Sequence, residues 1–166
     1  MSSFQVISNI ELEDLAANWG LPLVGVFSKD QLSGQPQSGG YIVNLQDWED
    51  GGGSHWVALY IEGKNAGFCD SFGEHPPQDV KDFVKKATKK YNMYVCVDQI
   101  QHLKSEACGY YCLAFIAYMR QMEHVEFTLR LNHFADLFDT QHLQKNDTTL
   151  RQFFHTNGFD TKTSQR

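Results

Sequence analysis

The sequence is short of basic residues. Its 166 residues include 14 lysines and arginines against 20 aspartates and glutamates, so the formal net charge is −6. Nucleic-acid binding relies on lysine and arginine side chains that neutralise backbone phosphates. We therefore do not expect nucleic acid to be a main partner, although a local basic face remains open.

Cysteine is scarce and irregularly spaced. The four cysteines, Cys69, Cys96, Cys108 and Cys112, form no Cys-x-x-Cys pair. A chain of this length can bury a core without disulfide staples, so these cysteines predict a reducing compartment.

Long apolar runs and a signal sequence are also missing. No apolar run approaches the roughly 20 residues that cross a bilayer, and Met1 to Val6 lack the basic and apolar regions of a secretory signal. We expect no membrane insertion and no secretion by the standard route. Gly51 to Gly53 are not followed by a Gly-Lys-Ser/Thr sequence, which argues against a phosphate loop.

What is present fits one folded unit. The sequence is 42% hydrophobic and 13% aromatic, enough for one buried core. We predict a single domain over residues 1–166, with 161–166 as a loose tail.

Hydrophobic periodicity predicts helices and strands in a mixed order. A capping box, Ser8 to Glu11, starts the first helix, which Gly20 ends. The other helices are predicted at 80–91, 108–122, 131–138 and 141–154. Strands are predicted at 23–27, 41–45, 55–62, 66–72 and 92–97, and polar loops at 33–40 and 47–54.

The turn between two of these strands decides which side chains meet. If Gly63-Lys64 is a two-residue turn, Val57 lies opposite Asp70, and His55 lies on the same sheet face as Asp70, one step diagonal to it. A three-residue turn without a bulge would separate them.

Cys108 opens the most apolar predicted helix. A helix N-terminus carries unpaired N–H groups and a partial positive charge, which favour the reactive thiolate. We expect Gly109 to let a substrate backbone come close. The plainer interpretation is a buried structural cysteine, which is how we interpret Cys112 and Cys69.

A thiolate needs a base, an orienter and an oxyanion donor. His55 is the predicted base and Asp70 holds its imidazole, while the Gln101 amide and the Cys108 N–H stabilise the oxyanion. No metal site is predicted, because the other histidines have no cysteine or carboxylate at ligand spacing.

Several alternatives stay open at this point. His102 lies next to Gln101 and is the weaker candidate base, and Glu74 or Asp79 could replace Asp70 if the hairpin register differs. Trp56 could form a wall of the site, but strand alternation points it away from the face of His55, which favours a core position.

Three motifs, taken in order, resemble a known family. They are Gly-Gly-Ser-His55-Trp-Val-Ala, then Phe-Cys-Asp70-Ser-Phe-Gly, then Gln101 followed after six residues by Cys108-Gly-x-x-Cys112. These blocks resemble those of the adenovirus-type maturation cysteine protease, adenain, which is in the same clan as the SUMO and other ubiquitin-like-protein proteases.

The resemblance implies a papain-like, adenain-like α+β fold, with a central mixed sheet packed against the helix that carries the nucleophilic cysteine. It implies a viral endopeptidase that cleaves capsid and core precursors after glycine during virion maturation. It places the protein in the virion and the infected cell, as a monomer that needs no cofactor for its chemistry. An activating viral peptide or DNA is also part of the family pattern.

Three departures from that pattern bear on the expectations. Adenain is basic whereas this chain is acidic, and its acid is a glutamate where this chain has Asp70. In adenain the activating peptide is attached through a disulfide. Cys96 lies in the region of the cysteine that would accept such a peptide, but at a different spacing from Gln101.

Two other activities remain open. A ubiquitin-like-protein deconjugase would need roughly 800 Å² of recognition surface, and this chain shows no added module for it. An acyltransferase could use the same histidine, acid and cysteine.

Overall fold

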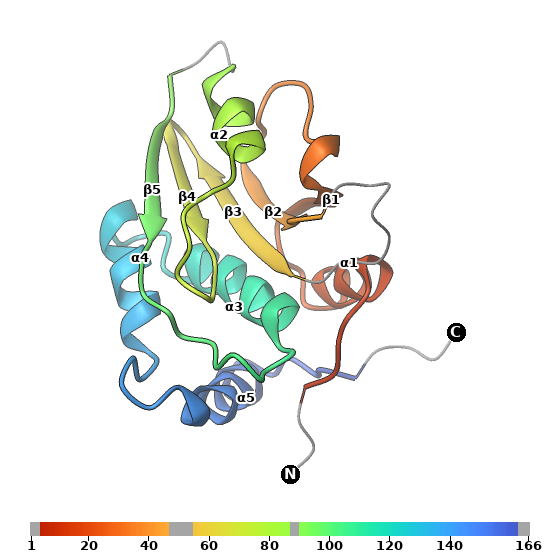
Figure 1. The fold of residues 1–166 in the computed structure, drawn as a ribbon, viewed down its shortest axis with the longest axis vertical. Coiled ribbons are helices and arrows are strands. Elements are labelled where there is room, and N and C mark those ends of the chain that lie inside the picture. Colours follow the sequence, from red (N-terminus) through yellow and green to blue (C-terminus); the bar gives the residue numbers. More distant parts are fainter. Residues whose placement is uncertain (1–3, 47–54, 87–89, 163–166) are drawn as a thin grey trace.

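A computed structural model describes residues 4–46, 55–86 and 90–162 (Figure 1). The predicted loop at 47–54 and residues 163–166 of the predicted tail lie outside the described residues.

A five-stranded mixed sheet forms the centre of the molecule, with its strands in sequence order. The outer pairs, β1 with β2 and β4 with β5, are parallel, whereas β3 runs antiparallel to both of its neighbours, β2 and β4. The strands are β1 (Leu23–Ser28), β2 (Gly39–Asn44), β3 (Trp56–Glu62), β4 (Asn65–Cys69) and β5 (Asn92–Cys96).

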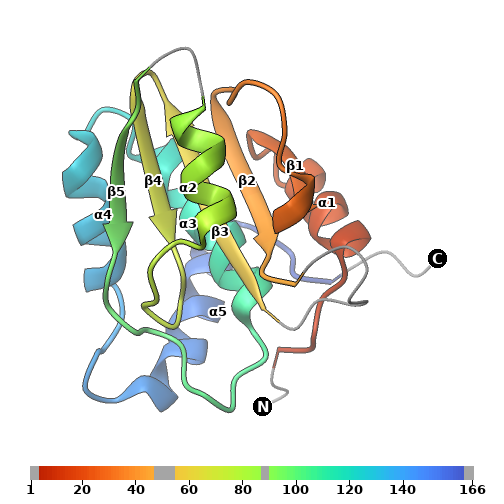
Figure 2. The same ribbon diagram turned by 45° about the horizontal axis from the view of Figure 1, so that its top comes forward.

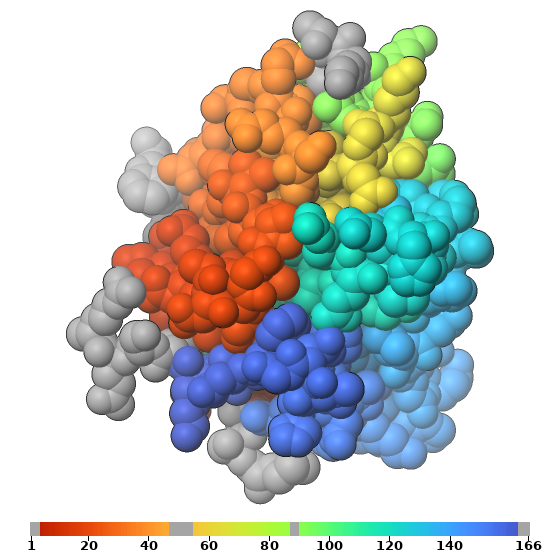
Figure 3. All heavy atoms as spheres, turned by 180° about the vertical axis from the view of Figure 1, so that it is seen from behind, coloured from red at the N-terminus to blue at the C-terminus, as the bar shows by residue number. Residues whose placement is uncertain are grey.

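Helices cover both faces of this sheet (Figures 1 and 2). On one face lies α2 (Gln78–Lys85), and on the other lie α1 (Asn9–Asn18), α3 (Cys108–Gln121), α4 (Phe127–Asp136) and α5 (Asn146–Thr156). Seen from behind, α1, α4, α5 and part of α3 make up much of the surface, next to segments of the first half of the chain in orange and yellow (Figure 3). Two short 3-10 helices, η1 (Lys29–Gln31) and η3 (Leu143–Lys145), join the larger elements.

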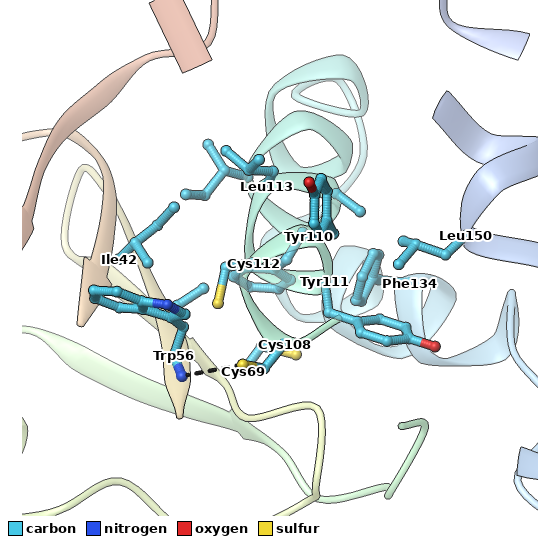
Figure 4. Packing of buried hydrophobic residues seen from close by; sticks show 14 of the residues in the cluster. Ile42, Trp56, Cys69, Cys108, Tyr110, Tyr111, Cys112, Leu113, Phe134 and Leu150 are labelled. Carbon is cyan, nitrogen blue, oxygen red and sulfur yellow. Dashed lines mark hydrogen bonds between the residues drawn. The ribbon is translucent and has the colours of Figure 1, made fainter. Parts of the chain in front are cut away.

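Alternation along β3 divides the core in two. Trp56, Ala58 and Tyr60 face α3. Val57, Leu59 and Ile61 face α2. The α3 layer is the larger, since α3 is buried along most of its length (Figure 4). A Cβ atom at Gly40 would lie 2.7 Å from the Ile116 side chain, so this glycine allows β2 and α3 to pack closely.

The β3–β4 hairpin has the predicted register. Glu62 lies opposite Asn65 and Ala58 opposite Cys69, with Gly63 and Lys64 as the turn. Gly63 has a φ of +59°, a left-handed conformation that glycine adopts without strain. The two-residue turn is therefore confirmed, and the three-residue alternative is wrong.

Other predicted boundaries need correction. The second helix ends at Lys85, and Tyr91 precedes β5 instead of continuing that helix. Strand β2 begins at Gly39, inside the predicted loop, because Gly39 pairs with Ile61 of β3.

The last two helices are shifted as well. Helix α4 begins at Phe127, where the Glu126 carboxylate accepts the Thr128 N–H and caps the first turn. Leu143 belongs to η3 and not to α5, which begins at Asn146. Within the described residues, no helix has both the length and the apolar character needed to cross a bilayer.

Candidate active site

The hairpin brings His55 and Asp70 into contact. His55 directly precedes β3 and Asp70 directly follows β4. The His55 Nε2 atom lies 2.7 Å from Asp70 Oδ1, which also accepts the Phe72 N–H at 2.8 Å. Asp70 is 1% exposed, so its carboxylate meets His55 away from water. Buried charge-assisted hydrogen bonds of this kind fix the orientation of an imidazole.

The surroundings of His55 favour its charged form. Burial lowers the pKa of His55, but Asp70 and the Cys108 side chain outweigh this effect and raise the pKa from 6.5 to about 9. The Phe72 ring lies against the imidazole, with 4.6 Å between ring centroids. The second ring nitrogen, Nδ1, is buried and forms no hydrogen bond within the described part of the chain. His55 therefore has one nitrogen committed to Asp70 and one still available.

Cys108 is the first residue of α3, with Ala107 at the N-cap. The first N–H groups of a helix have no intrahelical acceptor and carry partial positive charge. The Trp56 N–H also points at the Cys108 sulfur, with 3.5 Å between the N and Sγ atoms. Cys108 is 9% exposed, so its side chain is nearly enclosed where α3 begins.

Gln101 is held in one orientation by its neighbours. The Ser71 hydroxyl donates to Gln101 Oε1 at 2.5 Å, and Gln101 Nε2 donates to the Ser105 carbonyl oxygen at 2.8 Å. The Gln101 backbone N–H also donates to the Ser71 carbonyl oxygen at 3.0 Å. An amide nitrogen carries two hydrogens, so one remains for an oxyanion donor role.

The segment Asp70-Ser-Phe-Gly contributes more than its acid, which the sequence prediction missed. Asp70 binds His55, Ser71 binds Gln101, and Phe72 packs on the imidazole. Gly73 has a φ of +78°, and a Cβ there would lie 2.9 Å from the Gln99 backbone nitrogen. The motif itself was the available signal, because each of its four positions has a separate contact.

Gly109 does not have the predicted role. A Cβ atom at Gly109 would lie 2.4 Å from Ile7 Cγ2 and 3.1 Å from Leu12 Cδ2. This glycine therefore makes room for the N-terminal segment and not for a substrate backbone. Trp56 is a core residue, as strand alternation favoured, since it is 6% exposed and its indole N–H donates to the Ile7 carbonyl oxygen at 3.1 Å.

The other cysteines lie in the core. Cys112 and Cys69 are buried, as expected for structural residues (Figure 4). Burial raises the pKa of the Cys112 thiol well above its usual range. A hydrogen bond with Cys96, together with burial, raises the pKa of the Cys69 thiol in the same way. A raised pKa keeps both thiols protonated, so neither is suited to react as a thiolate.

The alternative base and acids are not brought to this site. His102 Nδ1 accepts the Lys104 N–H at 3.1 Å, within its own turn. Glu74 is exposed and Asp79 lies in the first turn of α2, whereas Asp70 contacts His55 directly. Among the described residues, no three His, Cys, Asp or Glu side chains gather in a way that could hold a metal ion.

Comparisons with known proteins bear on the fold. Neither a scan against protein-family models nor a search of curated proteins finds a match. Among solved structures, the ASFV pS273R protease is similar with a TM-score of 0.54 and 17% identity, over 96% of this chain and 68% of that chain.

Two further structures are similar. The central domain of the uncharacterized Lpg1148 protein from Legionella pneumophila has a TM-score of 0.54 and 11% identity, over 93% of this chain and 97% of that chain. A selenomethionine structure of the ASFV protease has a TM-score of 0.44 and 22% identity, over 73% of this chain. This chain thus spans 43% to 68% of the ASFV protease structures that it matches.

The TM-scores of 0.54 show a shared fold, whereas identities of 11% and 17% show nothing about the chemistry of the site. The predicted fold class is confirmed: the chain is an α+β protein with a mixed sheet packed against helices, and it shares this fold with the ASFV pS273R protease.

Proposed function

We propose that this chain is a cysteine endopeptidase that cleaves viral capsid or core precursor proteins after glycine during virion maturation. The observation that carries the proposal is the buried His55–Asp70 pair, joined at 2.7 Å, with the side chain of Cys108, the first residue of α3, interacting with His55. The fold shared with a viral protease supports it.

Acylation would begin at the Cys108 sulfur. His55 Nε2 is bonded to Asp70, so Nδ1 is the nitrogen that takes the proton of the Cys108 thiol, and the raised pKa of His55 favours the imidazolium that results. The thiolate attacks the carbonyl carbon of the scissile peptide bond, and the imidazolium then protonates the departing amine. Neutral His55 then takes a proton from water, which attacks the thioester carbonyl carbon. The carbon–sulfur bond breaks, the imidazolium returns the proton to the Cys108 sulfur, and the acid product leaves.

The oxyanion would form between two donors, the Cys108 N–H and the second hydrogen of Gln101 Nε2. Both donors are held in place before a substrate binds. The start of α3 holds the Cys108 N–H, and Ser71 and Ser105 hold the Gln101 amide. Donors fixed in advance stabilise the developing charge without reorganisation.

The substrate class rests on the three motif blocks that resemble adenain and on the viral origin of the ASFV protease. The proposal includes action in the virion and the infected cell, a monomeric enzyme, and chemistry that needs no cofactor. An activating viral peptide or DNA belongs to the same resemblance.

Cleavage of a library of peptides with small residues around glycine tests the proposal. Wild-type protein is expected to produce new ends after glycine, and Cys108→Ala is expected to produce none while keeping its melting temperature. Cys112→Ala is the matched control, because it removes a core thiol four residues along the same helix and should retain cleavage.

Two other arms of the assay separate the alternatives. Release of a ubiquitin-like protein from a fusion, without cleavage of the glycine peptides, would indicate a deconjugase. Transfer of an acetyl group to a lysine acceptor, with no peptide cut, would indicate an acyltransferase. Unchanged cleavage in Cys108→Ala would refute all three.

A further inference from the structure

The segment from Ile100 to Ala107 carries Gln101 and leads directly into Cys108. It contains no helix or strand, and Leu103 at its tip is 79% exposed. A segment without regular structure needs contacts from elsewhere to hold a side chain in one place. Ser71 supplies some of these contacts, and the start of α5 supplies others.

Asn146, the first residue of α5, holds one end of the segment. Its side chain is fully buried, and its Nδ2 atom donates to the Ile100 carbonyl oxygen at 2.7 Å. The same side chain is fixed by the Asp139 backbone, which it contacts through both Oδ1 and Nδ2 at 2.9 Å.

Asp147, the next residue, holds the other end. Its carboxylate accepts the Ser105 hydroxyl, with oxygen distances of 2.8 and 3.0 Å, and the Tyr111 hydroxyl at 2.9 Å. Ser105 is also the partner of Gln101, because its carbonyl oxygen accepts the Gln101 amide. Its Oγ atom accepts the Ala107 N–H at 3.2 Å, directly before Cys108. One serine therefore links Asp147 to the Gln101 amide and to Ala107, the residue before Cys108.

We propose that Asp147 is a positioning residue for the oxyanion site, acting through Ser105 on the Gln101 amide. The inference rests on the proposed function and adds a residue to that site. The hydroxyl hydrogen of Ser105 is committed to Asp147, which leaves the Oγ lone pairs for Ala107 and fixes the carbonyl that aims Gln101. Without the carboxylate, the Ser105 hydroxyl loses its acceptor. The Gln101 amide keeps its contact with Ser71, but the Ser105 carbonyl that it donates to loses its support.

A double-mutant cycle tests this role. Asp147→Ala is expected to lower kcat for peptide cleavage by about 10-fold to 100-fold with an unchanged KM, as for a small misplacement of a catalytic group. In the Gln101→Ala background, the same change should lower kcat by no more than about 2-fold, because the group that Asp147 positions is already gone.

Tyr111→Phe is the matched control. It removes another hydrogen bond to the same carboxylate but leaves both Ser105 contacts in place, so kcat should stay unchanged. If Asp147→Ala fails to fold, Ser105→Ala supports the same cycle, since it deletes only the hydroxyl and keeps the carbonyl that Gln101 uses.

The outcomes separate the inference from the proposed function. An equal loss of kcat in both backgrounds would overturn the positioning role while leaving the protease intact. No cleavage by wild-type protein, together with an unreactive Cys108, would overturn both. A loss of kcat on Asp147→Ala that occurs when Gln101 is present, and not in the Gln101→Ala background, supports both the positioning role and the proposed function.

Discussion

Replacement of Asp70 by asparagine should abolish the elevated pKa of His55. The imidazole side chain is only 13% exposed, and burial by itself lowers its pKa. Asp70 and Cys108 reverse this effect and bring the pKa from 6.5 to about 9. Asparagine keeps the size of the side chain and removes its negative charge, so burial should then dominate.

The size of the effect follows from the pKa. A rise from 6.5 to about 9 corresponds to about 3 kcal/mol of tighter proton binding in the folded state. Because the folded pKa is the higher one, this stabilisation is fully present below the unfolded pKa of 6.5 and is lost as the pH rises through about 9. The wild-type free energy of unfolding should therefore fall by about 3 kcal/mol between roughly pH 6 and pH 10 from this residue.

An NMR titration of the His55 ring and urea unfolding across this pH range measure the two quantities. In Asp70→Asn, the pKa of His55 should be 6.5 or lower, and most of the pH-dependent part of the free energy of unfolding should be lost. Glu74→Gln is the control, since Glu74 is an exposed carboxylate on the same connecting segment. A His55 pKa that stays near 9 in Asp70→Asn would refute the reasoning.

Three further substitutions test neighbouring parts of the account. Ser71→Ala removes the donor to Gln101 Oε1 and should lower kcat about 10-fold with KM unchanged, because one hydrogen bond that orients the oxyanion donor is lost. A raised KM with an unchanged kcat would contradict this role of Ser71. Gly109→Ala places a methyl 2.4 Å from Ile7 Cγ2 and should cost about 1–3 kcal/mol in urea unfolding, part of which Ile7→Ala in the same chain should restore; no loss would contradict the packing role. Glu62→Ala leaves Arg130, whose side chain is 3% exposed, without the carboxylate that it contacts at 2.6 and 2.8 Å, and should cost roughly 2 kcal/mol because Glu62 is partly exposed. Glu123→Ala, which breaks the exposed pair with Arg120, should cost under about 1 kcal/mol in urea unfolding. Equal costs for Glu62→Ala and Glu123→Ala would contradict the greater contribution of the buried Arg130 pair.

The sequence could predict the hairpin because local rules determine it. The turn at Gly63-Lys64 and the period of two along a strand placed His55 and Asp70 on one face. The first helix was equally local, since the Ser8 and Glu11 capping box is present as predicted. Helix boundaries after Met122 were shifted, because tertiary contacts such as that of Asn146 with Ile100 decide where α5 begins.

The contact of Asp147 with Ser105, which supports the Gln101 amide, could not be predicted from the chain. Asp147 and Ser105 are 42 residues apart in sequence, and nothing in their local patterns connects them. Gly109 was misinterpreted for a related reason: its neighbour Ile7 comes from a segment about a hundred residues earlier. Local patterns predicted the acid–base pair, whereas the support for the oxyanion donor depends on long-range packing.

Trapping of the acyl-enzyme tests the central claim most directly. Wild-type protein is mixed with a glycine-containing peptide substrate, quenched in acid within one turnover, digested and mapped by mass spectrometry. The account predicts an acyl group on Cys108, bound as a thioester that hydroxylamine removes, and none on Cys69, Cys96 or Cys112. Peptide cleavage without an adduct on Cys108, and undiminished in Cys108→Ala, would contradict it.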